Sequence, residues 1–389
     1  MTATEIFTTR IEGIASGGAG FARFEGKSIF VEGSAPDETL YCRIIEEHRS
    51  WAKAELLEII EASPERIQPV CAFYGICGGC NLQHINYSSQ LAAKTAILGD
   101  TFKRIGGFKP PEPKVFSSNP WEYRNRMQFH RTSTNGCGLK ARNSGDVIPV
   151  TDCPIADPGI RELLQNAALL SLPPEQNRFM VYARGGLLLS EGGVRRGKAH
   201  VLDRELSIEA ALFFQSNGAM LESLITGLKE IVTGNTMNVD RSRPMADLYC
   251  GVGTFAAFLG EFFPHIDLVE ENKSALSLAR ENLGFLAAAR TTPELYALRD
   301  EDWVKNVTHN SPAYGFIVVD PPRQGLAPAL ARWLAAKGPP LLAYVSCDPA
   351  TLARDSGILV KGGYELAELR FYDFYPQTSH IESLALFRR

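Results

Sequence analysis

The segment ADLYCGVGTFAAFLG (residues 246–260) has the pattern of a buried strand, a glycine turn and the start of a helix. Gly251 and Gly253 let the backbone approach a ligand closely at the carboxyl end of the strand. Glu270 ends the next apolar strand, where its carboxylate can accept hydrogen bonds from ribose hydroxyls. Because Gly251-x-Gly253-x-x-Ala256 also satisfies a dinucleotide fingerprint, these residues predict a nucleotide-type ligand without fixing which one.

The chain around this segment, from residue 213 onward, alternates apolar strands with helical segments. The strands are MADLYC, IDLVE, GFIVVD and LLAYVSC, and NKSALSLARENLGFL is typical of an intervening helix. This alternation predicts a parallel, doubly wound sheet. Open sheets of this kind bind ligands at the carboxyl ends of their strands, where GFIVVDPPRQGL (315–326) places Asp320 and LLAYVSCDPATLARD (341–355) places Cys347.

Cys347 adjoins Asp348 and Pro349 at the point where the chain leaves the sheet. A cysteine at a strand end is often buried packing, but this position favours a catalytic thiol. Addition of a thiolate to C6 of uracil turns C5 into a carbon nucleophile that can attack an activated methyl group. A base must then remove the C5 proton, and TSHIESLALFRR offers Glu382, although the position of this residue alone favours a solvated carboxylate at a strand end.

Residues 1 to about 62 contain short alternating segments separated by glycines. They predict roughly five strands in a small barrel of the OB type. Such a barrel can bind single-stranded nucleic acid, and it can equally serve as a structural cap. The composition of the segment does not decide between these two roles.

The chain has eight cysteines, and four of them are spaced like ligands. Cys71-x5-Cys77-x2-Cys80, with a distant Cys153, allows either zinc or an iron–sulfur cluster. Cys42, Cys137 and Cys250 are interpreted as structural. The N-terminus lacks the pattern of a secretory signal and no apolar stretch is long enough to span a membrane, so we expect a cytoplasmic protein.

At 389 residues the chain is expected to form two or three domains. A helix is predicted over YSSQLAAKTAILGDTFKRIGG, with Ser88 or Ser89 as its cap and Gly106 at its end. The proline-rich stretch KPPEPKVFSSNP (109–120) indicates a linker or boundary. Strand-like runs follow up to about residue 210.

The formal net charge of the whole chain is −4, but residues 101–150 carry nine basic and three acidic side chains, a net charge of +6. Aromatic residues are interleaved with the basic ones, so this basic window is a candidate RNA surface. The alternative is a solvated face with a few core aromatics. The basic residues are Lys103, Arg104, Lys109, Lys114, Arg124, Arg126, Arg131, Lys140 and Arg142, and the aromatic ones include Phe108, Phe116, Trp121, Tyr123 and Phe129.

Taken together, these motifs resemble the RNA uracil-C5 methyltransferases that carry an N-terminal TRAM domain and an iron–sulfur cluster. The resemblance covers nearly the whole chain. It rests on the glycine-rich strands before residue 62, CAFYGICGGCNLQH (71–84), FFQSN (213–217), DLYCGVGTF (247–255), DPPRQGL (320–326), SCDPATLARD (346–355) and HIES (380–383).

The resemblance implies an α/β protein with an all-β N-terminal domain, built from three domains. These are an OB-like TRAM barrel (1–62), an α+β iron–sulfur middle domain that binds RNA (63–90 and 120–212), and a Rossmann-like class I methyltransferase domain (91–119 and 213–389). The implied reaction is transfer of a methyl group from S-adenosylmethionine to C5 of a uridine, with Cys347 as nucleophile and Glu382 as base.

The resemblance also implies the ligand-binding residues. Gln215, Tyr249, Glu270 and Asp320 fall on positions that contact S-adenosylmethionine in the family, together with the turn of Gly251 and Gly253. Thr254 stands where relatives often have asparagine, and Asp320 could hold the target base instead of the cofactor. Cys71, Cys77, Cys80 and Cys153 are implied ligands of a 4Fe–4S cluster that staples the middle domain.

The implied partner is RNA whose target base is flipped out of its stack. Relatives modify ribosomal or transfer RNA, and the combination of barrel and cluster favours 23S ribosomal RNA. Neither a membrane nor an obligate protein partner is expected.

Three alternatives compete with this interpretation. A nicotinamide dehydrogenase fits the glycine turn and Glu270, but it leaves DPPR, SCDP and the four cysteines without roles. An RNA cytosine-C5 methyltransferase shares the thiol chemistry, but that group carries a Pro-Cys pair where this chain has Asp320-Pro321-Pro322-Arg323. A non-catalytic iron–sulfur RNA-binding protein would not require Cys347 and Glu382 together.

Overall fold

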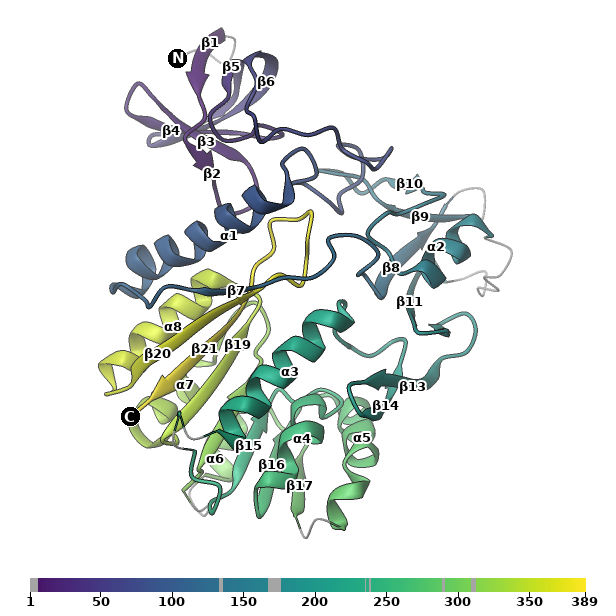
Figure 1. The fold of residues 1–389 in the computed structure, drawn as a ribbon, viewed down its shortest axis with the longest axis vertical. Coiled ribbons are helices and arrows are strands. Elements are labelled where there is room, and N and C mark those ends of the chain that lie inside the picture. The colour runs from purple at the N-terminus through teal and green to yellow at the C-terminus, as the bar shows by residue number, and fades with distance from the viewer. Residues whose placement is uncertain are drawn as a thin grey trace. The chain divides into compact units, whose positions relative to one another are not determined.

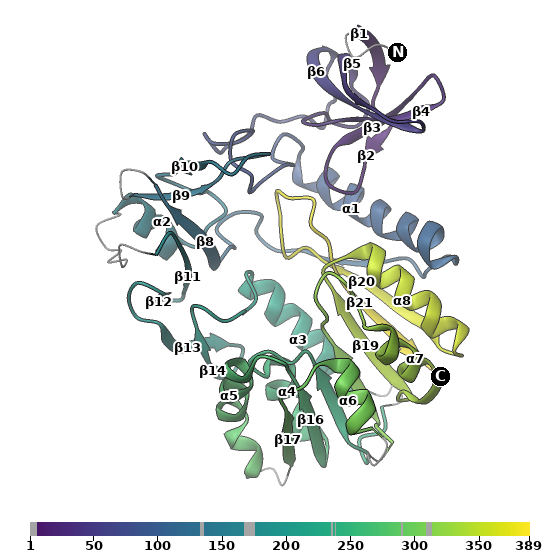
Figure 2. The same ribbon diagram turned by 180° about the vertical axis from the view of Figure 1, so that it is seen from behind.

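The computed structural model describes residues 6–132, 136–166, 176–234, 236–237, 239–288, 291–308 and 313–389. Its chain divides into two compact units (Figures 1 and 2). Unit 1 comprises residues 1–97, 130–154 and 375–380, and unit 2 comprises residues 98–129, 155–374 and 381–389.

Unit 1 begins with a six-stranded sheet in the order β1-β5-β6-β4-β3-β2. The strands are β1 Ile6–Arg10, β2 Gly13–Ile14, β3 Gly20–Phe24, β4 Lys27–Val31, β5 Thr39–Glu47 and β6 Trp51–Glu61. Alternate side chains, among them Phe7, Ile29 and Leu40, fill one core. This period of two is what buries one face of each strand, and the predicted all-β N-terminal region is confirmed.

The rest of unit 1 joins three distant parts of the sequence. The cysteine-rich segment of residues 71–80 pairs with residues 140–142, through the Cys77–Ala141 bridge and a hydrogen bond from the Gly78 amide to the Lys140 carbonyl. The hairpin of β9 (Cys137–Lys140) and β10 (Val147–Pro149) follows β8 (Arg126–Arg131). Residues 375–380 come from near the C-terminus.

Helix α1 (Tyr87–Thr101) begins differently from the prediction. The cap is Asn86, whose Oδ1 accepts the Ser89 amide at 2.9 Å, whereas neither Ser88 nor Ser89 caps the helix. A π-helical turn (Phe102–Gly106) extends it to the predicted end at Gly106, and Gly107 terminates it in the left-handed conformation, at φ 75°. Asparagine serves as a cap as readily as serine, so the two could not be separated by residue type.

Unit 2 is built on an eight-stranded sheet in the order β17-β16-β15-β18-β19-β21-β20-β7. Strands β15 to β19 run parallel, whereas β21 runs antiparallel to both β19 and β20. The strands are β15 Met245–Leu248, β16 His265–Val269, β17 Thr292–Tyr296, β18 Phe316–Val319, β19 Leu341–Ser346, β20 Glu365–Tyr372, β21 Glu382–Arg388 and β7 Lys114–Phe116. Fully buried runs such as FIVV in β18 are expected where helices cover both faces.

Helices do cover both faces of this sheet (Figures 1 and 2). Helices α3 and α4 pack together on one side, and α6, α7 and α8 pack in a row on the other. Their bounds, with that of α5, are α3 Gly218–Thr233, α4 Thr254–Leu259, α5 Lys273–Asn282, α6 Asp300–Asn306, α7 Pro328–Lys337 and α8 Pro349–Lys361. The predicted doubly wound α/β domain is confirmed.

The remaining elements of unit 2 come from the middle of the chain. They are α2 Pro158–Gln165, β11 Arg178–Arg184, β12 Leu187–Ser190, β13 Arg196–Val201 and β14 Arg204–Glu209. Strand β8 neighbours β11, and β13 pairs with β14 in a separate hairpin. No helix among the described residues is long and apolar enough to cross a membrane.

The aromatic part of the basic window differs from the predicted stacking surface. Phe129 is 0% exposed and Tyr123 is 8% exposed, so both belong to the core. Phe116 stacks on Tyr372 at a centroid distance of 4.6 Å. The basic residues are also divided between the two units, with Arg131, Lys140 and Arg142 in unit 1 and the other six in unit 2. Sequence spacing could not show which way each aromatic side chain points.

Candidate active site at the carboxyl edge of the sheet

The predicted site residues of unit 2 gather at one edge of its sheet. Tyr249, Glu270, Asp320 and Cys347 each directly follow a parallel strand, namely β15, β16, β18 and β19. Glu382 is the first residue of β21, which runs antiparallel to β19, and its neighbour Ser383 pairs with Ser346 at the end of β19. The strand order therefore brings residues more than 130 positions apart to one edge.

The glycine turn has the backbone that the sequence predicts. Tyr249, Gly251 and Gly253 all adopt positive φ, at 62°, 55° and 79°. A Cβ on Gly253 would lie 3.0 Å from the Cβ of Ala279 in α5, so this glycine also permits close packing of the helix. Of these three residues, Tyr249 has the strained backbone, because a residue with a side chain rarely adopts positive φ. Such strain concentrates at ligand sites. Thr254 begins α4 directly after the turn.

Glu270 braces this turn. One carboxylate oxygen accepts the Gly251 amide at 3.1 Å, and the other accepts the Asn272 amide at 2.8 Å. The Glu270 side chain thus lies against the glycine turn.

Asp300, a residue that the sequence reasoning missed, links three of the loops at this edge. Its Oδ2 accepts hydrogen bonds from the Tyr249 hydroxyl and from the Ala327 amide, the latter at 3.1 Å. Asp300 begins α6 after β17, so it connects the loops that follow β15, β17 and β18. An acidic residue at a helix start was the only signal in the sequence, and it is too common to be informative.

The buried polar atoms that lack a hydrogen-bond partner among the described residues include two acceptors in the segments around this edge. They are Oε1 of Gln215 and Oδ1 of Asp247. Asn217, which caps α3 through the Met220 amide and donates to the Phe374 carbonyl at 3.2 Å, fixes the segment that carries Gln215. Unsatisfied buried acceptors are costly, and a ligand with N–H donors would satisfy them. They therefore fit a cofactor with an amino group.

Cys347, Glu382 and Asp320 interact electrostatically at this edge. Burial first, and then the negative charges of Glu382 and Asp320, raise the pKa of the Cys347 thiol to about 12, whereas Arg323 opposes the rise. Burial also raises the pKa of Glu382 well above its usual range, again with Asp320 adding to the shift and Arg323 opposing it. Burial likewise raises the pKa of Asp320. The sequence did not assign Arg323 this role.

This arrangement provides a thiol and a basic carboxyl group in one partly desolvated place. Glu382 is 3% exposed, and burial raises its pKa well above the usual range, with Arg323 opposing the rise. A buried carboxylate is a stronger base than one in water. Perturbed groups of this kind cluster at catalytic sites because proton transfer requires them.

The four predicted cysteine ligands all lie in unit 1. The Cys71 thiol is close enough to Cys77 and Asp152 for both to raise its pKa, although burial is the larger cause. Cys153 is 9% exposed and the other three are partly exposed. Within the described chain no three cysteine sulfurs lie within 4.8 Å of one another. A zinc ion would hold sulfurs about 3.8 Å apart, given Zn–S bonds of about 2.3 Å.

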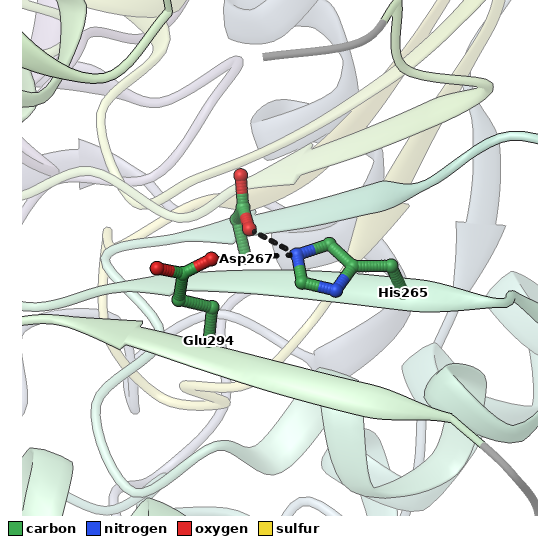
Figure 3. A group of neighbouring side chains, drawn as sticks. All are labelled: His265, Asp267 and Glu294. Atoms are coloured by element: carbon green, nitrogen blue, oxygen red, sulfur yellow. Dashed lines mark hydrogen bonds and ion pairs between the residues drawn. The ribbon is translucent and has the colours of Figure 1, made fainter. Parts of the chain in front are cut away.

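A group of three possible metal ligands lies elsewhere in unit 2, on β16 and β17 (Figure 3). His265 Nε2 lies 2.8 Å from Asp267 Oδ1 and 3.9 Å from Glu294 Oε2. Asp267 also accepts a hydrogen bond from the Tyr314 hydroxyl. Because these residues partner one another, the group reads as a hydrogen-bonded structural cluster.

Comparison with known proteins identifies two family models in the chain. The tRNA (uracil-5-)-methyltransferase family matches residues 196–389, and the TRAM domain matches residues 5–57. An uncharacterised RNA methyltransferase of Treponema denticola is 32% identical, over 94% of each chain. Another from Aquifex aeolicus is 30% identical over 97% of each chain.

A Shewanella protein named 23S rRNA (uracil(1939)-C(5))-methyltransferase RlmD is 28% identical, over 95% of this chain and 93% of its own. The crystal structure of Pyrococcus abyssi tRNA (uracil-54, C5)-methyltransferase with S-adenosyl-L-homocysteine shares the fold. Its TM-score is 0.74 at 22% identity, and the match covers 98% of this chain and all of that one. These similarities exclude the dehydrogenase alternative. With its TRAM region, its doubly wound domain and these relatives, the chain belongs to the S-adenosylmethionine-dependent RNA uracil-C5 methyltransferase family.

Proposed function

We propose that this protein methylates C5 of one uridine in 23S ribosomal RNA through a covalent adduct between Cys347 and C6 of the base. The observation that carries the proposal is the grouping of Cys347, Glu382 and Asp320 at the sheet edge, next to the glycine turn. A thiol and a buried base are the two groups that this reaction requires.

The chemistry proceeds in three steps. The Cys347 thiolate, its proton lost to solvent, adds to C6 of uracil, forming an S–C6 bond and moving the C5–C6 electron pair into an enolate. C5 then attacks the methyl carbon of S-adenosylmethionine, and the methyl–sulfur bond breaks to release S-adenosylhomocysteine. Glu382 finally removes the C5 proton, the C5–C6 double bond reforms, and the S–C6 bond breaks to release the thiolate.

The residues around the glycine turn are proposed to hold S-adenosylmethionine. Glu270 would accept hydrogen bonds from the ribose, and Gly251 and Gly253 would allow its close approach. Gln215 would accept a hydrogen bond through its unpartnered Oε1. Tyr249, Thr254 and Asp320 complete the set, with Asp320 facing either the cofactor or the target base.

The covalent step is tested by trapping the adduct with the variant Glu382→Gln. This variant can still add to C6 and transfer the methyl group, but it cannot remove the C5 proton. Incubation with 23S RNA fragments and methyl-labelled S-adenosylmethionine should give a labelled protein–RNA band on a denaturing gel, and mass spectrometry should place the link at Cys347. The control is Cys347→Ala/Glu382→Gln, which should give no band.

Wild-type protein that forms no 5-methyluridine in ribosomal or transfer RNA would contradict the proposed function as a whole. Methylation by the wild type without any trapped species in Glu382→Gln would instead contradict the role of Glu382 alone.

The choice of RNA is supported by the ribosomal activity in the name of the Shewanella relative. Transfer RNA is the second candidate, because the Pyrococcus abyssi protein of the same fold is named for a tRNA uracil. Methylation of total RNA from a strain lacking the gene, followed by mapping of 5-methyluridine, distinguishes the two. Label in 23S RNA supports the first candidate, and label confined to tRNA overturns it.

RNA binding is proposed to involve the TRAM region and the basic window. Lys103, Arg104 and Lys109 of that window are exposed. Each phosphate contact contributes about 0.9 to the slope of log affinity against log salt concentration. Reversing these three charges should therefore weaken binding and flatten its salt dependence, whereas unchanged affinity would remove this part of the window from the RNA surface.

Cys71, Cys77, Cys80 and Cys153 are proposed to hold a 4Fe–4S cluster. Each cysteine binds a different iron in such a cluster, so the four sulfurs lie farther apart than they would around one zinc ion. The cluster would staple residues 71–80 to residue 153. Anaerobic purification with iron and sulfide analysis tests this proposal, and stoichiometric zinc in place of iron would overturn it.

A further inference from the structure

The loop that leads to Glu382 has an unusual anchor. It joins β20 to β21, with Phe374 and Ile381 in unit 2 and residues 375–380 in unit 1. Gln377, at the centre of the loop, is 2% exposed and has φ 68°. A glutamine in the left-handed region persists only when its surroundings fix it, and such strain marks sites where position matters.

Gln90 of α1 provides the first half of this anchor. Its Oε1 accepts the Gln377 amide at 3.0 Å, and its Nε2 donates to Gln377 Oε1 at 2.9 Å. Nε2 also lies within hydrogen-bond distance of the Leu82 and Ile85 carbonyls, at 3.0 and 2.8 Å. Gln90 is 0% exposed, so every one of these bonds is shielded from water. The two glutamines form a reciprocal pair.

Asn81 provides the second half. The Asn81 and Leu82 amides both donate to the Gln377 carbonyl, at 3.1 and 3.0 Å. The Asn81 side chain accepts the Ser379 amide at 2.9 Å and donates to Ser379 Oγ at 3.0 Å. It also donates to the Gly17 carbonyl at 2.8 Å. Asn81 directly follows Cys80, so it ties the cysteine-rich segment to the loop.

Gly18 packs closely against Asn81 and Ser379. A Cβ on Gly18 would lie 2.5 Å from Asn81 Nδ2 and 3.1 Å from Ser379 Cβ. Three segments that are distant in the sequence therefore converge on one asparagine. The final residue that they fix, Ser379, stands only three positions before Glu382 in the chain.

We propose that Gln90, Asn81 and Gln377 form a clasp that positions Glu382 for removal of the C5 proton. They are positioning residues, since they act through the loop and do not touch the reacting atoms. The inference rests on the proposed function, because it assigns the clasp to the last step of that reaction. Misplacement of a catalytic group by about 1 Å can cost about 100-fold in rate.

The test compares Gln90→Ala, Asn81→Ala and Gln377→Gly with wild type. Gln377→Gly removes the side-chain pair but relieves the backbone strain, so it keeps the test informative if Gln90→Ala fails to fold. Ser88→Ala is the matched control, because Ser88 lies on the same helix, is exposed, and donates its hydroxyl to Asn86 Oδ1 at 2.7 Å, outside the clasp. Each variant is assayed for turnover, KM for RNA, and methylated adduct at steady state.

The clasp variants should lose roughly 10- to 100-fold in turnover with an unchanged KM for RNA, and the methylated Cys347 adduct should accumulate. A general structural defect would lower turnover without accumulating the adduct. In addition, Gln90→Ala/Glu382→Gln should form adduct as fast as Glu382→Gln, because the clasp has no further effect once the base is absent.

A loss of turnover without adduct, a slower adduct formation in the double variant, or wild-type turnover in all three variants would overturn the clasp. Wild type and Glu382→Gln are assayed alongside, so that failure of these two proteins exposes an error in the proposed function and not in the clasp.

Discussion

At the carboxyl edge of the unit 2 sheet Glu382 is 3% exposed, and on β16 of the same sheet Asp267 is also 3% exposed. Asp267 accepts hydrogen bonds from Tyr314 and His265, which oppose the rise in pKa caused by its burial. Glu382 has only Arg323 opposing burial and the charge of Asp320. The two side chains have the same exposed fraction but different surroundings. Asp267 is therefore a carboxylate stabilised by hydrogen bonds, whereas Glu382 has the raised pKa that suits a base.

The largest effect is expected at the carboxyl edge, for the variant Cys347→Ala. Loss of the nucleophile should lower methylation by at least about 10⁴-fold, because the remaining groups cannot form the C6 adduct. Product formation is measured with labelled S-adenosylmethionine, and binding of S-adenosylhomocysteine serves as the control for an intact cofactor site. Activity within tenfold of wild type would show that another group attacks C6.

The matching change on β16 is Asp267→Ala. It leaves the Tyr314 hydroxyl and the His265 ring without their acceptor, which should cost about 1–3 kcal/mol of stability. Turnover should stay within about twofold of wild type at a temperature where the variant is folded. Denaturant unfolding measures the first effect, and a large loss of turnover with normal stability would mean that this cluster has a functional role.

Asp320→Asn tests the electrostatic coupling between Asp320 and Cys347 at the carboxyl edge. Because the negative charge of Asp320 contributes to the pKa of about 12 of Cys347, its removal should lower that pKa. Each pKa unit changes the thiolate fraction about tenfold below the pKa. Alkylation of Cys347 by iodoacetamide at about pH 8, followed by mass spectrometry of its peptide, should be faster in Asp320→Asn and slower in Arg323→Ala. Equal rates would contradict the electrostatic coupling.

The smallest expected effect is a gain of stability in Glu382→Gln at neutral pH. The pKa of Glu382 is raised in the folded state, so the folded protein retains this proton over a range in which the unfolded chain loses it. Its contribution to stability is therefore full below the unfolded pKa and falls as pH rises from there to the folded pKa. Glutamine does not titrate, so the advantage of the variant should grow as the pH rises above the unfolded pKa of about 4.3.

Melting temperatures at several pH values measure this difference. Asp267→Ala should be less stable than wild type at neutral pH, so the two variants should move in opposite directions. A change in melting temperature of the same sign in both variants would contradict the distinction between a carboxylate held by hydrogen bonds and a carboxyl group whose pKa is raised by burial.

The sequence predicted the edge of the sheet on which the site lies, because each motif follows an apolar strand and parallel strands end together. Asp320 and Cys347 were found in this way, whereas the role of Glu382 was implied only by the family resemblance. Arg323 and Asp300 were missed as site residues, since their importance comes from neighbours that lie far away in the sequence. The positive φ of Gln377 was equally invisible, because nothing in PQTSH marks a strained glutamine.

The N-terminal strands and the doubly wound domain were predicted from periodicity, which depends only on local alternation. The stacking role of Phe129 was not confirmed, because its ring is buried in the core, and a basic neighbourhood cannot reveal the direction of a side chain. The direction in which a side chain points, and the residues that it contacts, are set only when the chain is packed.

The central claim, that Cys347 attacks and Glu382 removes the C5 proton, is tested most directly with RNA carrying tritium at C5 of uridine. Tritium release and methyl incorporation are counted in the same reaction. We expect wild type to release as much tritium as it incorporates methyl groups, and Glu382→Gln to incorporate methyl groups without releasing tritium. Release of tritium from Glu382→Gln in step with methylation would contradict it, because another group would then be the base.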